Sequence, residues 1–264
     1  CFVYGTIRQM KKVIYTTERM PMDANEKLKV AVVGAGPAGL FAADALAAKG
    51  YGVALFNRDI KPGGLAEYGI FPDKYRLRNG LRKQFSLILA CDKIAYFGNV
   101  HLGVGKCVDL ATLFEWGFEA VLITCGAQGI KSLNLPGESL EGVFHAKDLV
   151  CHYNKLPPYA SWEFNFGKKV AIVGAGNVMA DVTHFLTKFT HVEEITAVIR
   201  RGPGEVKFDK KEMEAIISYL DLPAFDREVE RVSGEMIKVG QDVKAIKEEL
   251  LAALPKATPK ERDA

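Results

Sequence analysis

The chain has 264 residues, of which 48% are apolar and 25% charged, enough apolar side chains for one or two domains with a substantial core. Its net charge of +3 is too small to indicate nucleic-acid binding. We expect no membrane span, because the longest uncharged apolar candidate, from Val30 to Ala43, ends at Asp44, short of the roughly 18 residues required. The N-terminus lacks an apolar signal-peptide core, and its acidic residues argue against a transit peptide, so a cytoplasmic location is expected.

The first predicted unit begins with the strand Val30–Val33, an apolar run typical of a parallel strand buried on both faces. A glycine-rich turn follows directly, then a helical pattern, then a second strand over Val53–Phe56. In such a turn Gly34 permits the tight bend, Gly36 lets the backbone approach a pyrophosphate, and Gly39 lets the helix pack closely on the strand. The helix N-terminus supplies N–H donors, so the segment predicts a dinucleotide site.

The residue after the second strand departs from the usual fingerprint. An acidic side chain is expected there to bind the ribose diol, and this chain has Asn57. We expect its amide to accept one hydrogen bond from a ribose hydroxyl, without charge.

A second glycine-rich turn follows the predicted strand Val170–Val173, with Gly174 and Gly176 in the same places as before. Met179 replaces the third glycine, which predicts looser packing of the next helix on the strand. The following strand, Ile195–Ile199, leads into two arginines and a glycine.

Arg200 and Arg201 lie where the 2′-phosphate of an adenosine would bind. Guanidinium groups suit phosphate because their donors form a planar fork. The alternative is that both side chains only solvate the strand end. The second turn therefore predicts NADP(H), with NAD as the alternative.

The rest of the chain is predicted to be helical and charge-rich, over residues 205–254. Asp209 and Glu212 have the spacing of a capping box that opens a helix over 210–220. We expect a break at Pro223 and another helix near 241–253. No convincing strand follows Ile195–Ile199, and a sheet that ended there would expose an unpaired edge, which folded domains avoid. We therefore expect a fragment, with roughly 100–200 further residues after its end, and Cys1 trailing from an upstream iron–sulfur segment.

Reactive side chains form no catalytic or metal-binding pattern. The histidines are scattered, and there is no H-E-x-x-H or G-x-S-x-G motif. No two cysteines form a C-x-x-C pair, so a redox-active dithiol is disfavoured and free buried thiols are expected; the cysteines occupy positions 1, 91, 107, 125 and 151. We predict no catalytic side chain and no metal site.

Five further motifs occur in a fixed order between and after the two turns. They are KPGGLAEYGIFPDKYRLRN (61–79), FGNVHLG (97–103), AVLITCGAQG (120–129), LNLPGESLEGVFHAKDLVCHYNKLP (133–157) and RRGPGEVKFDKKE (200–212). Over residues 28–220 the chain resembles the adrenodoxin-reductase-like flavoproteins, including the adrenodoxin-reductase type of ferredoxin–NADP reductase and, more distantly, the small subunit of glutamate synthase.

The resemblance implies two sets of cofactor-binding residues. Those assigned to FAD are Gly34, Gly36, Pro37, Ala38, Gly39, Asn57, Gly64, Leu65, Val108, Thr124, Cys125 and Gly126. Those assigned to NADP are Gly174, Gly176, Asn177, Val178, Arg200, Arg201 and Glu212. Within the first set, Gly64 and Leu65 resemble the loop that closes over the flavin.

The resemblance also implies the reaction: hydride transfer between nicotinamide and flavin, and electron transfer to an iron–sulfur protein or subunit. Lys74 replaces a histidine of the family motif, and the family's later G-x-x-x-G-P loop is not present, so no catalytic residue is carried over. The alternative function is a nucleotide-binding scaffold or electron-transfer subunit of a larger complex, with NADH as its nucleotide.

We predict an α/β fold with two Rossmann-like units, the NADP unit inserted in the FAD unit. The predicted parts are an N-terminal extension (1–27), the first part of an FAD-binding domain (28–150) and an incomplete NAD(P)-binding domain (151–264). Prolines near 140–160 suggest the boundary.

Overall fold

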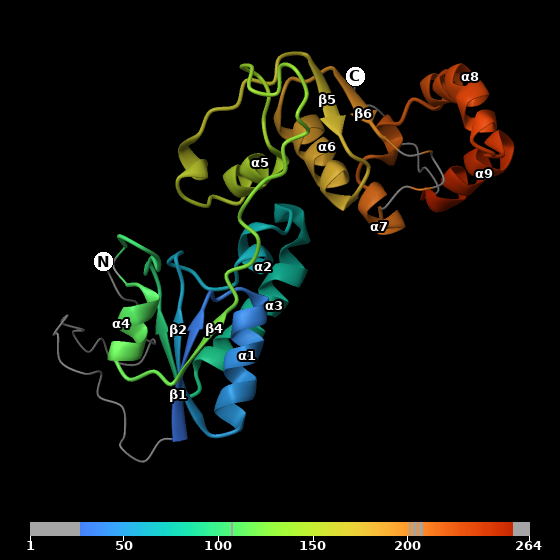
Figure 1. The fold of residues 1–264 in the computed structure, drawn as a ribbon. Helices are drawn as coiled ribbons and strands as arrows, with labels where there is room; N and C mark the ends of the chain where they lie inside the picture. Colours follow the sequence, from blue (N-terminus) through green and yellow to red (C-terminus); the bar gives the residue numbers. More distant parts are fainter. Residues whose placement is uncertain (1–26, 107, 201, 203–204, 206–207, 256–264) are drawn as a thin grey trace. The chain divides into compact units, whose positions relative to one another are not determined.

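The computed structural model describes residues 27–106, 108–200, 202, 205 and 208–255, which form two compact units (Figure 1). Unit 1 comprises the described residues up to Glu138 together with Val150–Trp162. Unit 2 comprises Ser139–Leu149 and the described residues from Glu163 onward. The predicted division after residue 150 falls inside helix α5 (Ala146–Tyr153), and the assignment of the two parts as domains stays a prediction.

Unit 1 contains a parallel sheet with the strand order β3-β2-β1-β4. The strands are β1 (Lys27–Val33), β2 (Tyr51–Phe56), β3 (Ile94–Phe97) and β4 (Ala120–Ile123). In register, Val30 of β1 lies beside Val53 on one side and Ala120 on the other. All four carboxyl ends therefore meet at one edge, where both the first glycine turn and the end of β4 lie.

Helices cover both faces of this sheet (Figure 1). On one face pack α1 (Pro37–Ala48) and α3 (Tyr75–Leu89), and on the other α4 (Leu110–Glu115). The unit also contains α2 (Leu65–Tyr68) and the short 3-10 helices η1 (Pro72–Lys74) and η2 (Tyr159–Ser161). Side chains alternate along β1: Val30 and Val32 pack with α1 and α3, whereas Ala31 packs on the α4 side. This alternation is the reason an unbroken apolar run suits a strand buried on both faces.

Unit 2 contains two parallel strands, β5 (Lys169–Val173) and β6 (Glu194–Val198). Its helices are α6 (Asn177–Phe189), α7 (Lys210–Met213), α8 (Leu222–Lys238) and α9 (Val243–Ala253), with the 3-10 helix η4 (Ile217–Tyr219). A small apolar core joins α6 and α7 to the residue that follows α9; it consists of Ala180, Met213, Ile216 and Leu254.

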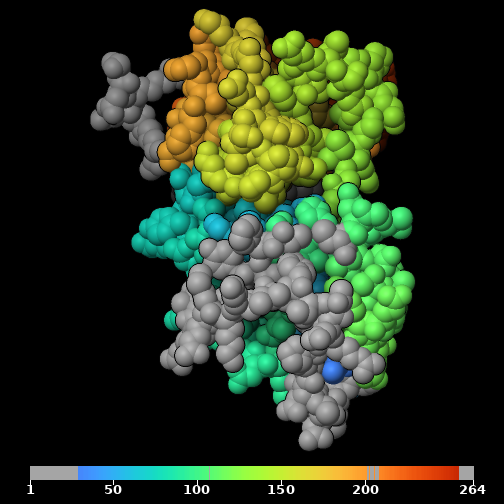
Figure 2. Space-filling view, turned by 90° about the vertical axis from the view of Figure 1, so that its left-hand side faces the viewer, coloured from blue at the N-terminus to red at the C-terminus, as the bar shows by residue number. Residues whose placement is uncertain are grey.

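The incoming segments of unit 2 carry an aromatic cluster. The ring centroid of Phe144 lies 5.0 Å from that of Phe164 and 5.7 Å from that of Phe166. The yellow-green and yellow segments that contain these residues are visible at the surface of unit 2 in Figure 2. Phe144 is 41% exposed, so this cluster lies at the surface of the unit.

Several predictions for the C-terminal third need correction. The helix predicted over 210–220 is only the single turn α7, followed by η4. Pro223 does not break a helix but occupies the first turn of α8, where its missing N–H costs nothing. The helix predicted near 241–253 is confirmed as α9. Within residues 202, 205 and 208–255, no strand follows β6.

Among the described helices, none has both the length and the apolar character that a membrane crossing requires.

Candidate nucleotide-binding sites

The first glycine turn is held by the neighbouring strands. Gly34 has φ of +107°, a conformation that favours glycine, and donates its N–H to the carbonyl of Phe56 at 2.7 Å. A Cβ atom at Gly34 would lie 2.6 Å from the carbonyl oxygen of Thr124 on the adjacent strand end. The tight bend therefore needs glycine for both its backbone angle and its contact with β4.

Gly39 brings helix α1 against the turn, as the sequence predicts. A Cβ atom there would lie 1.8 Å from the Gly34 carbonyl oxygen and 2.7 Å from Thr124 Oγ1. The Thr124 hydroxyl is itself hydrogen-bonded to the Gly34 carbonyl at 2.8 Å. The resemblance assigns Thr124 to the FAD site, and its side chain also locks β4 to the turn.

Gly36 is open on the side where a ligand would approach. It is the N-cap of α1, with no side-chain cap and no acidic residue in the first helical turn, and Pro37 and Ala38 after it are exposed. A Cβ atom at Gly36 would meet no other atom of the described chain within 4 Å. The N–H groups at this helix start are thus available to an anion.

A second loop lies over Gly36. Gly63 donates its N–H to the Ala35 carbonyl at 2.7 Å, and a Cβ atom at Gly64 would lie 3.0 Å from Gly36 Cα. Leu65, directly after it, is 72% exposed although apolar. The residues Gly64 and Leu65 assigned to the closing loop are therefore brought to the first turn.

The other residues assigned to FAD lie at the carboxyl ends of β2 and β4 or on the α4 face of the sheet. Cys125, two residues after β4, is exposed and departs from the expected buried thiols, whereas Cys151 is buried as expected. Gly126 follows Cys125 with φ of +67°. Val108 is buried on the α4 side of the sheet, and its carbonyl accepts from Gly103 at 2.9 Å. Asn57 is buried at the end of β2.

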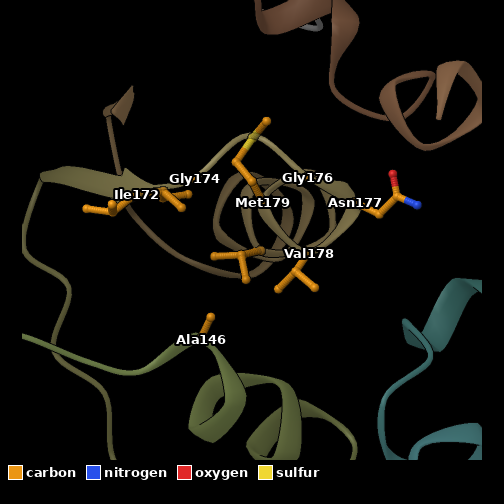
Figure 3. A pocket seen from close by; sticks show the side chains of 9 residues that line it. Ala146, Ile172, Gly174, Gly176, Asn177, Val178 and Met179 are labelled. Carbon is orange, nitrogen blue, oxygen red and sulfur yellow. The ribbon is translucent and has the colours of Figure 1, made fainter. Parts of the chain in front are cut away.

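The second turn repeats the first. Gly174 has φ of +127° and donates its N–H to the Val198 carbonyl at 2.9 Å, as Gly34 does to the last residue of β2. Gly176 is the N-cap of α6, again with no side-chain cap and no acidic residue in the first turn. A cavity of about 280 Å³ adjoins this turn; it is lined by Ala146, Ile172, Val173, Gly174, Gly176, Asn177, Val178, Met179 and Val182 (Figure 3).

Figure 3 shows how the side chains of α6 divide at this turn. Val178 points toward Ala146, whereas Met179 points to the opposite side of the helix. There Met179 packs against the small core of unit 2. The side chain that replaces the third glycine is thus accommodated by that core.

Asn177 is fastened to Asp209 by two reciprocal hydrogen bonds. Its Nδ2 donates to the Asp209 carboxylate at 2.7 Å, and its Oδ1 accepts the Asp209 N–H at 2.8 Å. The predicted capping box is therefore wrong: Asp209 is the N-cap of α7, but its carboxylate makes no cap hydrogen bond. The latch brings α7, with Glu212, to the start of α6.

Arg200 is exposed two residues after β6 and has no hydrogen-bond or ion-pair partner among the described residues. Arg201 lies outside the described residues. The predicted phosphate contact at this strand end thus rests structurally on Arg200.

An ion pair that no sequence pattern predicts holds the closing loop. Glu67 of α2 is buried and accepts from Arg82 of α3 at 2.6 Å and 2.7 Å. Lys61 Nζ lies 3.9 Å from the same carboxylate. The Arg82 hydrogen bonds hold the pKa of Glu67 below its ordinary value, although burial acts to raise it. The pair fastens α2, directly after the Gly63–Gly64 loop, to α3.

Replacing Glu67 with glutamine should lower the free energy of unfolding at neutral pH by about 1–2 kcal/mol, since charge-assisted hydrogen bonds contribute ~1.5–3 kcal/mol and Arg82 is half exposed. Because the folded-state pKa is lowered, this contribution is present above the ordinary value of 4.5 and is lost as the pH falls through the lowered value. In urea denaturation, the difference from the wild type should therefore shrink in acid.

The matched control is Glu228→Gln, which removes a bidentate pair with Arg231 of the same lengths, 2.6 Å and 2.7 Å, on an exposed face of α8. It should change stability little at any pH. Equal losses for the two variants, or a Glu67→Gln loss independent of pH, would contradict the role given to Glu67.

Comparison with known proteins decides the family. Residues 28–220 match the family model described as pyridine nucleotide-disulphide oxidoreductase. The chain belongs to this pyridine nucleotide-disulphide oxidoreductase family. Its α/β class with a parallel sheet agrees with that assignment, and the resemblance to adrenodoxin-reductase-like flavoproteins is confirmed by individual relatives.

Two members of the family illustrate the similarity. The mitochondrial NADPH:adrenodoxin oxidoreductase of Arabidopsis thaliana is 29% identical over 267 residues, covering 91% of this chain and 54% of the relative. The NADPH-ferredoxin reductase FprA of Mycobacterium leprae is 32% identical over 235 residues, covering 78% of this chain and 51% of the relative. The chain thus spans about half the length of the curated relatives it matches.

A solved structure supports the same relationship. FprA of Mycobacterium tuberculosis in complex with NADPH matches with a TM-score of 0.70 and 27% identity, covering 89% of this chain and 58% of that one. Within the part of the chain that the structure describes, no three His, Cys, Asp or Glu side chains are grouped to hold a metal ion.

Proposed function

We propose that this protein is an FAD-dependent oxidoreductase that passes electrons between NADPH and an iron–sulfur protein. The observation that supports this most is the repeated turn: Gly34 and Gly174 make the same hydrogen bond, and Gly36 and Gly176 each begin an uncapped helix. Two dinucleotide sites in one chain suit a protein that binds a flavin and a nicotinamide together. The relatives named NADPH:adrenodoxin oxidoreductase and NADPH-ferredoxin reductase carry this activity in their names.

The residues of the first turn fit the pyrophosphate and ring of FAD. Gly36 leaves space beside free N–H donors, and the first turn of α1 has no acidic side chain to repel a phosphate. Leu65 and Ile123 are 72% and 61% exposed, so apolar surface is available for a ring. Bound there, FAD would supply the chemistry that couples hydride transfer from a nicotinamide to one-electron transfer.

The residues of the second turn fit NADP(H). The cavity at Gly174 and Gly176 adjoins the start of α6, and Arg200 is free to meet a 2′-phosphate. The work of the protein would be to bind and orient the two nucleotides and to exclude water, which needs no nucleophilic side chain. NAD remains the alternative nucleotide.

A docking surface for the partner is predicted on the helical region. The sequence suggests basic side chains of the helical region as a docking surface; these are Lys207, Lys210, Lys211, Arg227, Arg231, Lys238, Lys244 and Lys247. Lys207 lies outside the described residues, and the last four residues of this set form ion pairs with acidic side chains of α8 and α9. Such pairing favours the alternative of a solvated helical face.

Membership of a multi-subunit complex and a cytoplasmic location also stay predictions. The names of several relatives place them in mitochondria.

The test is the reduction of an acceptor by NADPH. Purified protein supplied with FAD should oxidise NADPH with ferricyanide and, separately, with a plant-type ferredoxin as acceptor. Binding of nucleotide without reduction of either acceptor would support the scaffold function instead. Reduction of ferricyanide alone would leave the flavin assignment in place and refute this class of partner.

A further inference from the structure

The side chain of Asn57 is fully engaged inside unit 1. Asn57 is 7% exposed, and its Oδ1 accepts the N–H of Ala35, inside the first glycine turn, at 3.0 Å. Its Nδ2 donates to the backbone carbonyls of Asp59 at 2.9 Å and Lys61 at 3.1 Å, and lies 3.3 Å from the hydroxyl of Tyr96 on β3. One amide thus joins the turn, the loop after β2 and the neighbouring strand.

The loop held in this way leads directly to the site. Residues 59–61 precede Gly63, which donates its N–H to the Ala35 carbonyl, and Gly64, which lies over Gly36. Any displacement of the Asp59 and Lys61 carbonyls would therefore move the loop that covers the first turn.

An acidic residue could not make these contacts. A carboxylate of the same shape could still accept from Ala35, but its second oxygen would face two carbonyl oxygens in place of an N–H₂ donor. Both hydrogen bonds from Nδ2 to these carbonyls would be lost and replaced by repulsion between oxygen atoms. At this position the dinucleotide fingerprint usually has an acid that improves binding.

We propose that Asn57 is a positioning residue of the first nucleotide site, whose uncharged amide holds the glycine turn and the covering loop together. In this chain the acid of the usual fingerprint weakens dinucleotide binding. The identity of the ligand as FAD rests on the proposed function, whereas the role of the amide rests on its own contacts.

The titratable groups around Asn57 are Tyr96 on β3 and, in the loop, Asp59, which is paired with Arg58 at 3.2 Å. Burial raises the pKa of Tyr96 to about 12, so its hydroxyl stays protonated in the range of interest. Asp59 and Arg58 are present in the wild type and in the variants, so the ratio of FAD affinities of two proteins at the same pH removes their effect.

The experiment measures FAD affinity by quenching of flavin fluorescence for the wild type and Asn57→Asp between about pH 4 and 8. At neutral pH the variant should bind FAD about tenfold or more weakly, through loss of two hydrogen bonds. In acid the introduced carboxyl is protonated and can donate to one carbonyl, so the difference in FAD affinity between the variant and the wild type should become smaller. Because the neighbouring carbonyls disfavour the charged form of this carboxyl, the difference should start to decrease at a pH above the ordinary aspartate pKa of about 3.9.

Controls separate this role from general damage. Gln84→Glu adds the same charge at an exposed position of α3 and should leave FAD affinity and the unfolding temperature unchanged. If Asn57→Asp is unfolded at neutral pH, Tyr96→Phe is the milder variant: it loses the hydroxyl that donates to Ile60 at 3.0 Å and should weaken FAD affinity a few-fold, equally at all pH values.

Thermal unfolding without FAD gives a second readout, in which Asn57→Asp should be destabilised at neutral pH and recover in acid. A wild type that binds no FAD would refute the proposed function, while this unfolding comparison would still test Asn57. FAD affinity and unfolding temperature of Asn57→Asp equal to or above the wild-type values at neutral pH would overturn the proposal.

Discussion

Replacing Gly39 with alanine should destabilise unit 1 by about 3 kcal/mol or more, the upper range for forced overpacking. Inside a helix this substitution normally stabilises by about 1 kcal/mol, so the expected sign is reversed. The new Cβ atom would lie 1.8 Å from the Gly34 carbonyl oxygen, which cannot retreat because the Thr124 hydroxyl and the Phe56 carbonyl hold the turn. Urea denaturation monitored by far-UV circular dichroism measures the change.

Gly36→Ala is the matched control in the same turn. A Cβ atom there meets nothing within 4 Å in the described chain, and the backbone φ of −73° suits alanine, so the unfolding free energy should fall by only about 0.5–1 kcal/mol, roughly the difference between glycine and alanine at an N-cap. The methyl group would instead occupy the space left for a pyrophosphate, and FAD affinity should fall about tenfold or more. If both variants lose stability equally, or if Gly36→Ala binds FAD normally, the first turn does not bind FAD in this way.

Replacing Arg200 with alanine should weaken NADPH binding about 10- to 100-fold and NADH binding little. One charge-assisted hydrogen bond to the 2′-phosphate is worth ~1.5–3 kcal/mol, and NADH has no such phosphate. Arg201→Ala, alone and combined with Arg200→Ala, tests the second predicted arginine. Binding of both nucleotides is measured by titration calorimetry.

Lys188→Ala removes a cation from the last turn of the same helix, α6, far along the chain from its glycine turn, and serves as the control. It should leave the preference for NADPH unchanged. Equal losses of NADPH and NADH affinity in Arg200→Ala would contradict the 2′-phosphate assignment and favour NADH as the nucleotide.

The elements that depend on neighbours in sequence could be predicted. Val30–Val33 is recognisable because both faces of β1 are buried, and Gly34 and Gly39 because the turn admits no side chain. The end of α1 is also set by a local residue, because Gly50 adopts φ of +93° just after the helix, a conformation that favours glycine.

The contacts that depend on distant residues could not be predicted. The Asp209 carboxylate is taken by Asn177, 32 positions earlier, and this competition defeats the local capping box. The sequence predicts Asn57 as an uncharged ribose ligand. Its contact with Tyr96 is not predictable in this way, because Tyr96 lies 39 positions away. Sequence patterns report periodicity and local turns, whereas these hydrogen bonds exist only once the sheet has brought its carboxyl ends together.

The most direct test of the central claim, two cooperating nucleotide sites, is anaerobic mixing of the FAD-loaded protein with NADPH while the flavin absorbance is followed. We expect the wild type to carry bound flavin whose visible band bleaches on mixing with NADPH. Arg200→Ala should slow this bleaching at low NADPH but not with NADH, and Gly36→Ala should carry little flavin. A wild type that binds NADPH yet retains no flavin, or whose bound flavin is not reduced by either nucleotide, would contradict the account.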